Sequence, residues 1–277
     1  MGDEIRPGRY RLHSRFARVS NFFAGDMLVS LVGTEIGPGP VNLVAAPLPA
    51  DPASPWLEIA ADGTATLGGA RLDLGSAERY DSRLPQCADS RHLQRTLPVL
   101  AQTLLDQAPA ESLAFLLDDR RISALQGGFA AAFASHAAAA ITQIFQGDPL
   151  TGVGALRGSG LGLTPSGDDF NAGLLLALNL LAQSCAAEAR AGWCTMIEQV
   201  YQSARGQSLL SNAFLELASR GRVFARMKAL IAELCAGEDE AVEAAAGAAL
   251  LVGATSGADL AVGLYLGLTQ AGRLARF

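Results

Sequence analysis

The chain has 277 residues, half of them hydrophobic and only 17% charged, which is enough for one large domain or two ordinary ones with a substantial core. Its net charge of −6 and the lack of any run of basic residues exclude the charge pattern of a nucleic-acid-binding protein. The cysteine spacing fits neither a disulfide framework nor a zinc site, and the N-terminus lacks the apolar stretch of a signal peptide. We therefore expect a protein of a bacterial-type cytoplasm.

The first 85 residues or so are predicted to be rich in β-strands. β-branched and aromatic runs lie on either side of Gly-Pro-Gly-Pro at 37–40, which is a turn because proline cannot continue a helix. Residues 56–75 then predict two or three short strands around the hairpin dipeptide Asp62-Gly63.

From about Ser90 the hydrophobic periodicity becomes helical, with polar or glycine breaks between the segments. The segments predicted to be helices are 92–107, 111–119, 127–147, 166–184, 187–205, 208–220, 222–236, 238–253 and 256–271. We therefore predict an α+β fold. A small β-rich N-terminal domain, barrel-like or sandwich-like, covers residues 1–88, and a larger, mostly α-helical domain covers residues 89–277.

One segment, residues 244–268, is long and almost free of charge, as a membrane span would be. However, Asp259 lies within it, and a Thr-Ser-Gly-Ala-Asp turn signal divides it into two pieces, each too short to cross about 30 Å of hydrocarbon. Two buried, closely packed helices are the preferred interpretation, and a membrane span is the second one.

The most unusual stretch of the sequence is Gly-Ser-Gly-Leu-Gly-Leu-Thr-Pro-Ser-Gly-Asp-Asp at 158–169, directly before an apolar helix. Residues 166–178 are identical to residues 256–268 at seven of thirteen positions, and share the pattern S-G-x-D-x-x-x-G-L-x-L-x-L. Asp169 therefore corresponds to Asp259. An internal duplication, or the same helix start used twice, would explain the likeness.

The simplest interpretation of each S-G-x-D motif is a helix cap. In such a capping box, Ser166 or Ser256 accepts a hydrogen bond from the N3 amide, and Asp169 or Asp259 reaches back to the cap residue. Acidic side chains in the first turn also suit the helix dipole. Taken alone, each motif is more often a cap than a binding site.

Three features go beyond capping and predict a ligand site. Asp168 is a second acid that a cap does not need, and the preceding glycines leave backbone N–H groups accessible at a helix N-terminus, where anions bind. The helix is also apolar on every face, so its start should open into the interior or a cleft. A P-loop is excluded because no lysine follows the glycines, and a dinucleotide-binding loop because no good strand precedes them.

The residue types divide the predicted ligand into two ends. Asp168, Asp169 and Asp259 would suit Mg²⁺ or the N–H donors of an amide or carbamoyl group, whereas Arg157 and the glycine amides would suit an anionic end such as phosphate. We therefore predict that Asp168 and Asp169 are catalytic and are candidate magnesium ligands. The candidate ligand-binding residues are Arg157, Gly160, Gly162, Thr164, Ser166, Asn21, Ser256 and Asp259.

Other polar residues are weaker candidates. Asn21 is most simply a turn or bulge residue, with a ligand-facing role as the alternative. His136 lies on a small-residue helix, where a lone histidine is more often a packed residue than an acid or a base. Ser211 and Asn212 are expected to pack or to cap a helix.

The stretch Gly-Leu-Thr-Pro-Ser-Gly-Asp-Asp at 162–169 resembles the signature of the AllH-like proteins. These form a bacterial family described as of unknown function or as carboxylase-like, and one branch is a subunit of oxamate carbamoyltransferase. The likeness extends to residues 18–32 with the following Gly-Pro-Gly-Pro, and to the S-x-x-x-L-x-x-A-x-x-G pattern at 211–221, so it covers nearly the whole chain. Leu161 stands where family members usually have proline.

The resemblance implies a role in carbamoyl transfer between an oxamate-type amide and phosphate, or in a related carboxylate-amide reaction, together with partner protein subunits. Two alternatives stand beside this enzyme hypothesis. One is a non-catalytic structural or interaction subunit, in which the S-G-x-D motifs are only caps. The other is a carboxylase-like enzyme of unknown substrate. Neither nucleic acid nor a membrane is an expected partner.

Overall fold

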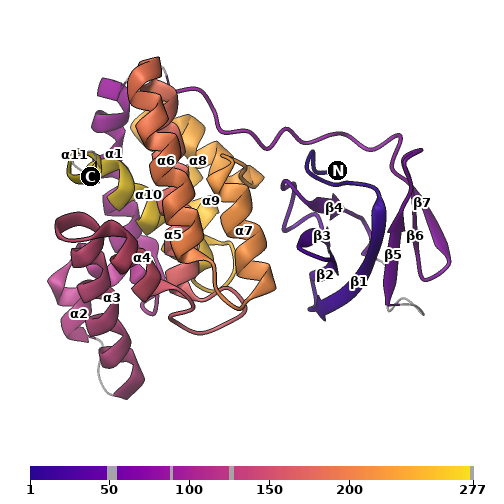
Figure 1. Cartoon of the computed structure of the whole chain (residues 1–277), viewed down its shortest axis with the longest axis horizontal. Helices are drawn as coiled ribbons and strands as arrows, with labels where there is room; N and C mark the ends of the chain where they lie inside the picture. Colours follow the sequence, from indigo (N-terminus) through magenta and orange to yellow (C-terminus); the bar gives the residue numbers. More distant parts are fainter. Residues whose placement is uncertain (49–54, 88–89, 125–127, 275–277) are drawn as a thin grey trace. The chain divides into compact units, whose positions relative to one another are not determined.

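We describe the fold from a computed structural model of the chain, which describes residues 1–48, 55–87, 90–124 and 128–274. The chain forms two compact units: unit 1 is Met1–Arg83 with Val223–Ala225, and unit 2 is Leu84–Arg222 with Arg226–Phe277. The predicted α+β fold is confirmed, because a curled, half-barrel sheet is followed by a mostly helical region (Figure 1). The predicted domain boundary, between residues 88 and 89, lies outside the described residues.

Unit 1 contains a single sheet in the order β4-β3-β2-β1-β5-β6-β7, with antiparallel neighbours except for the parallel pair β3 and β4. The hairpin predicted at Asp62-Gly63 joins β5 to β6, where Gly63 has a φ of +81° and the Asp62 carboxylate accepts a hydrogen bond from the Thr64 N–H at 2.9 Å. The strands are β1 (Gly8–Arg15), β2 (Val19–Ala24), β3 (Met27–Val32), β4 (Asn42–Val44), β5 (Trp56–Ile59), β6 (Thr64–Leu67) and β7 (Ala70–Asp73).

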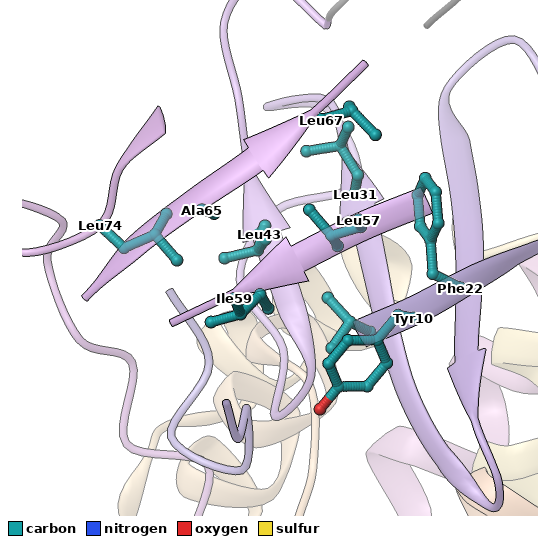
Figure 2. Close-up of a cluster of buried hydrophobic side chains, with 10 residues drawn as sticks. Tyr10, Phe22, Leu31, Leu43, Leu57, Ile59, Ala65, Leu67 and Leu74 are labelled. Carbon is teal, nitrogen blue, oxygen red and sulfur yellow. The ribbon is translucent and has the colours of Figure 1, made fainter. Parts of the chain in front are cut away.

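The core of unit 1 is built from alternate residues of these strands, as expected where one face of a sheet is buried. Tyr10, Phe22 and Leu57 are almost fully buried, and Figure 2 shows them gathered with the aliphatic side chains of the neighbouring strands. The curl of the sheet thus closes over its own hydrophobic face.

Unit 2 is built around the apolar helix predicted at 166–184, which is α5 in Figure 1. Fifteen of its nineteen residues are buried, so the expectation that it lies in the interior is confirmed. Helices α6, α7 and α10 pack against it. The helices of the described chain are α1 (Ser90–Gln107), the 3-10 helix η1 (Leu113–Leu117), α2 (Asp119–Ala124), α3 (Gly128–Gln146), α4 (Pro149–Leu156), α5 (Ser166–Ser184), α6 (Ala187–Ala204), α7 (Leu209–Ser219), α8 (Ala225–Ala236), α9 (Asp239–Leu250), α10 (Ser256–Thr269) and α11 (Ala271–Leu274).

The apolar segment 244–268 is divided between α9 and α10, as the turn signal predicts. Within the described residues, one helix, α3, is long and apolar enough to cross a membrane by length and composition alone, with 28% of its apolar window buried. A single helix of this kind is weak evidence for a membrane span, since core helices pass the same test.

Candidate functional site

The two S-G-x-D motifs begin two helices, α5 and α10, that cross at very short range. A methyl group added at Gly173 would overlap the backbone carbonyl oxygen of Leu260, and one added at Gly263 would overlap that of Phe170. Only glycine has no Cβ, so the last glycine of each motif is what lets the two backbones approach. The repeated sequence therefore builds a pair of matched helices.

The first glycine of each motif plays a similar part on the opposite side. A Cβ at Gly167 would overlap the carbonyl oxygen of Leu156 at the end of α4, and a Cβ at Gly257 would overlap that of Ala249 near the end of α9. Each helix start therefore packs against the helix that precedes it. The glycines hold the two motifs in place within the interior of unit 2.

The predicted capping boxes are wrong. Ser166 is the first residue of α5, with Pro165 in the cap position, and Ser256 is the first residue of α10, with Thr255 in the cap position. Neither cap residue makes a side-chain hydrogen bond to its helix. The two serine side chains do not cap their own helices, because their hydroxyl groups interact with the aspartate of the other helix instead.

Each serine hydroxyl lies beside the aspartate of the opposite motif. The Ser256 hydroxyl lowers the pKa of Asp169, and the Ser166 hydroxyl lowers that of Asp259, because a hydroxyl donor favours the charged form of a carboxyl group. The hydroxyl oxygens of Thr164 and Ser256 are 3.1 Å apart, which ties the loop before α5 to the start of α10. The two motifs therefore meet through their serines, with Asp259 beside Ser166 and Asp169 beside Ser256.

Asp169 is buried, and its Oδ2 atom has no hydrogen-bond partner among the described residues. Burial raises the pKa of its carboxyl group well above the usual range. The hydroxyls of Ser256 and Thr164 offset part of that rise, whereas the negative charges of Asp259 and Asp168 add to it. The charged groups that act on Asp169 among the described residues, Asp259 and Asp168, are both acidic, so each of them disfavours its ionised form.

Asp259 is completely buried, at 0% exposure. Its Oδ1 atom accepts a hydrogen bond of 2.6 Å from the backbone N–H of Leu113, the first residue of η1. Burial raises the pKa of Asp259 to about 6, against the opposing effects of the Leu113 N–H and the nearby Ser166 and Thr255 hydroxyls. Neither hydroxyl closes a hydrogen bond on Oδ2, which no described residue partners.

Asp168 has a different role in the geometry. Its carboxylate accepts a hydrogen bond of 2.7 Å from the Gly158 N–H, so it anchors the start of the glycine loop. Burial raises its pKa, while the Gly158 N–H, the Ser211 hydroxyl and the charge of Arg157 lower it. The second acid of the motif is thus explained by the loop, and its predicted catalytic role stays a prediction.

The glycine loop between α4 and α5 offers fewer backbone donors than the sequence suggests. The Gly158 N–H is taken by Asp168, and the Gly167 N–H donates to the Ser159 carbonyl at 2.9 Å. Gly160 and Gly162, with φ values of +108° and +101°, donate to no other described residue. The anion-binding part of the prediction therefore depends on these two N–H groups and on the exposed Arg157.

Magnesium binding by Asp168 and Asp169 stays a prediction over the residues that the structure describes. Over those residues, no group of three or more histidine, cysteine, aspartate or glutamate side chains is placed to hold a metal ion. Asp168, Asp169 and Asp259 therefore do not form a three-carboxylate metal site, whereas magnesium is often held by only one or two carboxylates.

The remaining predicted site residue, Asn21, lies in β2 of unit 1. It is neither in a turn nor itself the bulge, but lies opposite an irregularity in β1. Its side chain donates to the Ser14 hydroxyl at 3.1 Å and accepts from the Ser30 hydroxyl at 2.8 Å. These contacts account for a buried asparagine within the sheet.

Sequence reasoning missed three groups near the aspartates. Thr255 directly precedes Ser256, but in the motif comparison it aligns with Pro165, so the comparison gives no signal for it. The Leu113 N–H has no sequence signal, because any residue supplies a backbone donor. Asn171 is fully buried on α5, donates to the Val153 carbonyl at 3.2 Å and leaves its Oδ1 without a partner among the described residues.

The sequence profile of one protein family matches this chain over residues 156–268, and the family is described as oxamate carbamoyltransferase subunit AllH. The matched segment runs from the end of α4 through α10 and contains both S-G-x-D motifs. Over that segment the chain is similar to this family. The description names a subunit, that is, one chain of a multi-subunit enzyme. No curated protein and no solved structure matches the chain.

Proposed function

We propose that this AllH-like chain is a subunit of a carbamoyltransferase and that it holds a small carboxylate-amide or carbamoyl phosphate at the paired starts of α5 and α10. The observation that carries the proposal is the pair of buried aspartates, Asp169 and Asp259, each with one unpartnered carboxyl oxygen. Buried polar atoms without partners are uncommon in proteins, and at a functional site they are often completed by a ligand.

The chemistry of the site fits a ligand with two different ends. Carboxyl oxygens accept hydrogen bonds from the N–H groups of an amide or carbamoyl group. Arg157 and the N–H groups of Gly160 and Gly162 are donors, which suits a carboxylate or phosphate. Asp169 follows Gly162 closely in the chain, and Thr164 between them lies 3.1 Å from the Ser256 hydroxyl of the second motif, which supports one small molecule engaging both sets of groups.

A second candidate function is a non-catalytic subunit that organises its partners. It is favoured by two leucines that are largely exposed, Leu161 in the glycine loop at 75% and Leu251 after α9 at 74%. Large exposed apolar side chains at adjacent turns suit a surface that another chain covers. In that case the aspartate pair would serve only to hold α5 against α10.

Ligand-induced thermal stabilisation of the full chain separates the two functions. We expect oxamate, carbamoyl phosphate or both to raise the melting temperature of the wild type, because a ligand present at about 100 times its Kd stabilises a protein by about 2.7 kcal/mol. Asp169→Asn should reduce that rise. Glu240→Gln is the matched control, because it changes an exposed acid in the first turn of α9 and should leave the rise unchanged.

If neither probe shifts the melting temperature of the folded wild-type chain, the binding proposal fails for this chain, and the organising subunit becomes the better account.

A further inference from the structure

The geometry of the aspartate pair is fixed by the backbone around it. The α5 and α10 axes cannot separate or slide without disturbing the close contacts at Gly173 and Gly263. The Leu113 N–H holds one oxygen of Asp259 at 2.6 Å. Each aspartate is therefore held beside the crossing, where the charge of Asp259 acts on the carboxyl group of Asp169.

If both carboxyl groups were ionised, they would repel each other strongly, because they are buried away from water. Asp169 is 7% exposed and Asp259 is 0% exposed, so solvent screens neither of them. The exchanged Ser166 and Ser256 hydroxyls stabilise a negative charge but cannot supply a positive one. A single proton held between the two carboxyl groups removes the repulsion, as in the carboxyl pairs of aspartic proteases.

We infer that Asp169 and Asp259 share one proton and together present one O–H donor and one carboxylate acceptor to the ligand, with Ser166 and Ser256 as positioning residues. A primary amide has the matching edge, because its N–H donates to the acceptor and its C=O accepts from the donor. The inference rests on the proposed function, since it names the groups that recognise the amide end of the proposed ligand. Oxalate, which is a dianion without an N–H group, does not match.

The direction of the pKa shifts agrees with this arrangement. The pKa of Asp169 is raised by burial and by Asp259, and that of Asp259 is raised to about 6 by burial. Asp168 is the other acid that acts on Asp169, and the charge of Arg157 acts on Asp168. The group contributed by η1 is the neutral Leu113 N–H.

The test is a titration of the aspartate carboxyl carbons by NMR in the unliganded full chain. We expect the pair to lose its protons in two well-separated steps, with one proton still bound between them. In Asp259→Asn the step of Asp169 should move to lower pH, because a negative neighbour has been removed. Both carboxyls titrating independently near their usual pH, unaffected by the partner's removal, would overturn the inference.

Milder variants keep the test valid if an aspartate variant fails to fold. Ser256→Ala should raise the pKa of Asp169, Ser166→Ala should raise that of Asp259, and Ser256→Thr should restore the first value because it keeps the hydroxyl. A purely structural serine would change stability without moving the titration of the opposite aspartate, and that outcome counts against the inference.

Binding measurements then separate this inference from the proposed function. Oxamate affinity should fall about tenfold for each pH unit above the upper titration step, because binding uses the proton, and oxalate should bind more weakly than oxamate. If oxamate binds with no such dependence, the shared proton is wrong and the carbamoyltransferase proposal survives. If the carboxyls titrate as a pair but neither oxamate nor carbamoyl phosphate binds, the proposed function fails, and the amide recognition fails with it.

Discussion

The start of α5 and the start of α10 share their helix geometry but differ in what leads into them. Both carry the serine, aspartate and two glycines that set the crossing and pair the carboxyl groups. Nine residues, 157–165, precede α5, whereas five residues, 251–255, precede α10. The longer connection holds the positive-φ Gly158, Gly160 and Gly162, and Asp168 anchors it where the second motif has Ala258.

This difference separates the residues that hold the two helices together from the residues that would recognise one end of a ligand. The shared residues account for the packing of the two helices and supply the carboxyl pair, which is the proposed binding site of the amide end of the ligand. The residues found only in the first copy form an exposed loop with an arginine and open backbone donors. If the chain binds a ligand with two unlike ends, the unshared loop is where the second end is recognised.

The largest loss of stability should come from substitutions at the glycines where α5 and α10 cross. Gly173→Ala and Gly263→Ala should each destabilise the chain by at least about 4 kcal/mol or prevent folding, because the added methyl overlaps the backbone of the other helix. Denaturant unfolding measures the change. Gly192→Ala on α6, where a Cβ meets nothing within 4 Å, should instead stabilise by about 0.5–1 kcal/mol. Equal effects at the crossing and control glycines would refute the close crossing.

The second prediction concerns Asp259, the more deeply buried member of the carboxyl pair. The pKa of Asp259 is raised from 3.8 to about 6, and this shift corresponds to a destabilisation of about 3 kcal/mol at neutral pH. At low pH both the folded and the unfolded chain hold the proton, and no cost arises. As the pH rises from 3.8 to about 6, the unfolded chain releases the proton while the folded chain keeps it, so stability falls.

Asp259→Asn should remove this loss, because asparagine is neutral and has the same shape and still accepts from the Leu113 N–H. The unfolding free energy of the variant should be close to that of the wild type at about pH 4 and should exceed it by up to about 3 kcal/mol at about pH 7. Urea unfolding at a series of pH values measures the difference. A difference that stays constant with pH would mean that Asp259 is not held protonated.

The sequence predicted those features that follow from local patterns. The hairpin at Asp62-Gly63 and the buried helix α5 are confirmed, because turn chemistry and apolar periodicity are local. The alternation of Tyr10 and Leu12 with Arg9 and Arg11 was an available signal for β1, but it was not recognised as a strand. The repeat at 166–178 and 256–268 correctly marked the two helices that belong together.

The parts that failed depend on contacts between distant segments. The capping box has the right residues at the right spacing, but Pro165 and Thr255 take the cap positions. Ser166 interacts with Asp259, and Ser256 with Asp169, because the two helices cross at the motif glycines. The sequence of one helix alone does not show this crossing. Asp168 looked surplus for the same reason, because its partner, the Gly158 N–H, is ten residues earlier.

The third prediction tests the unshared loop through its two central glycines. Gly162→Ala should cost about 1 kcal/mol, because a residue with a side chain is strained at a φ of +101° although a Cβ there meets nothing within 4 Å. Gly160→Ala should cost more, about 2 kcal/mol, because its Cβ would also lie 2.8 Å from the Ser166 nitrogen. Thermal unfolding ranks the two. The reverse order would show that Gly160 is not in close contact with the start of α5.

The smallest effect on the isolated chain should come from the exposed leucines that lead into the two helices. Leu161→Ser and Leu251→Ser should each change the unfolding free energy by less than about 0.5 kcal/mol, because these side chains are 75% and 74% exposed. The comparison becomes sharper when partner subunits are present. If the glycine loop serves only to bind a ligand, both variants should assemble like the wild type in sedimentation measurements. Loss of assembly in both variants, with oxamate stabilisation unchanged, would instead assign this end of unit 2 to subunit contact and leave the aspartate pair as the ligand site.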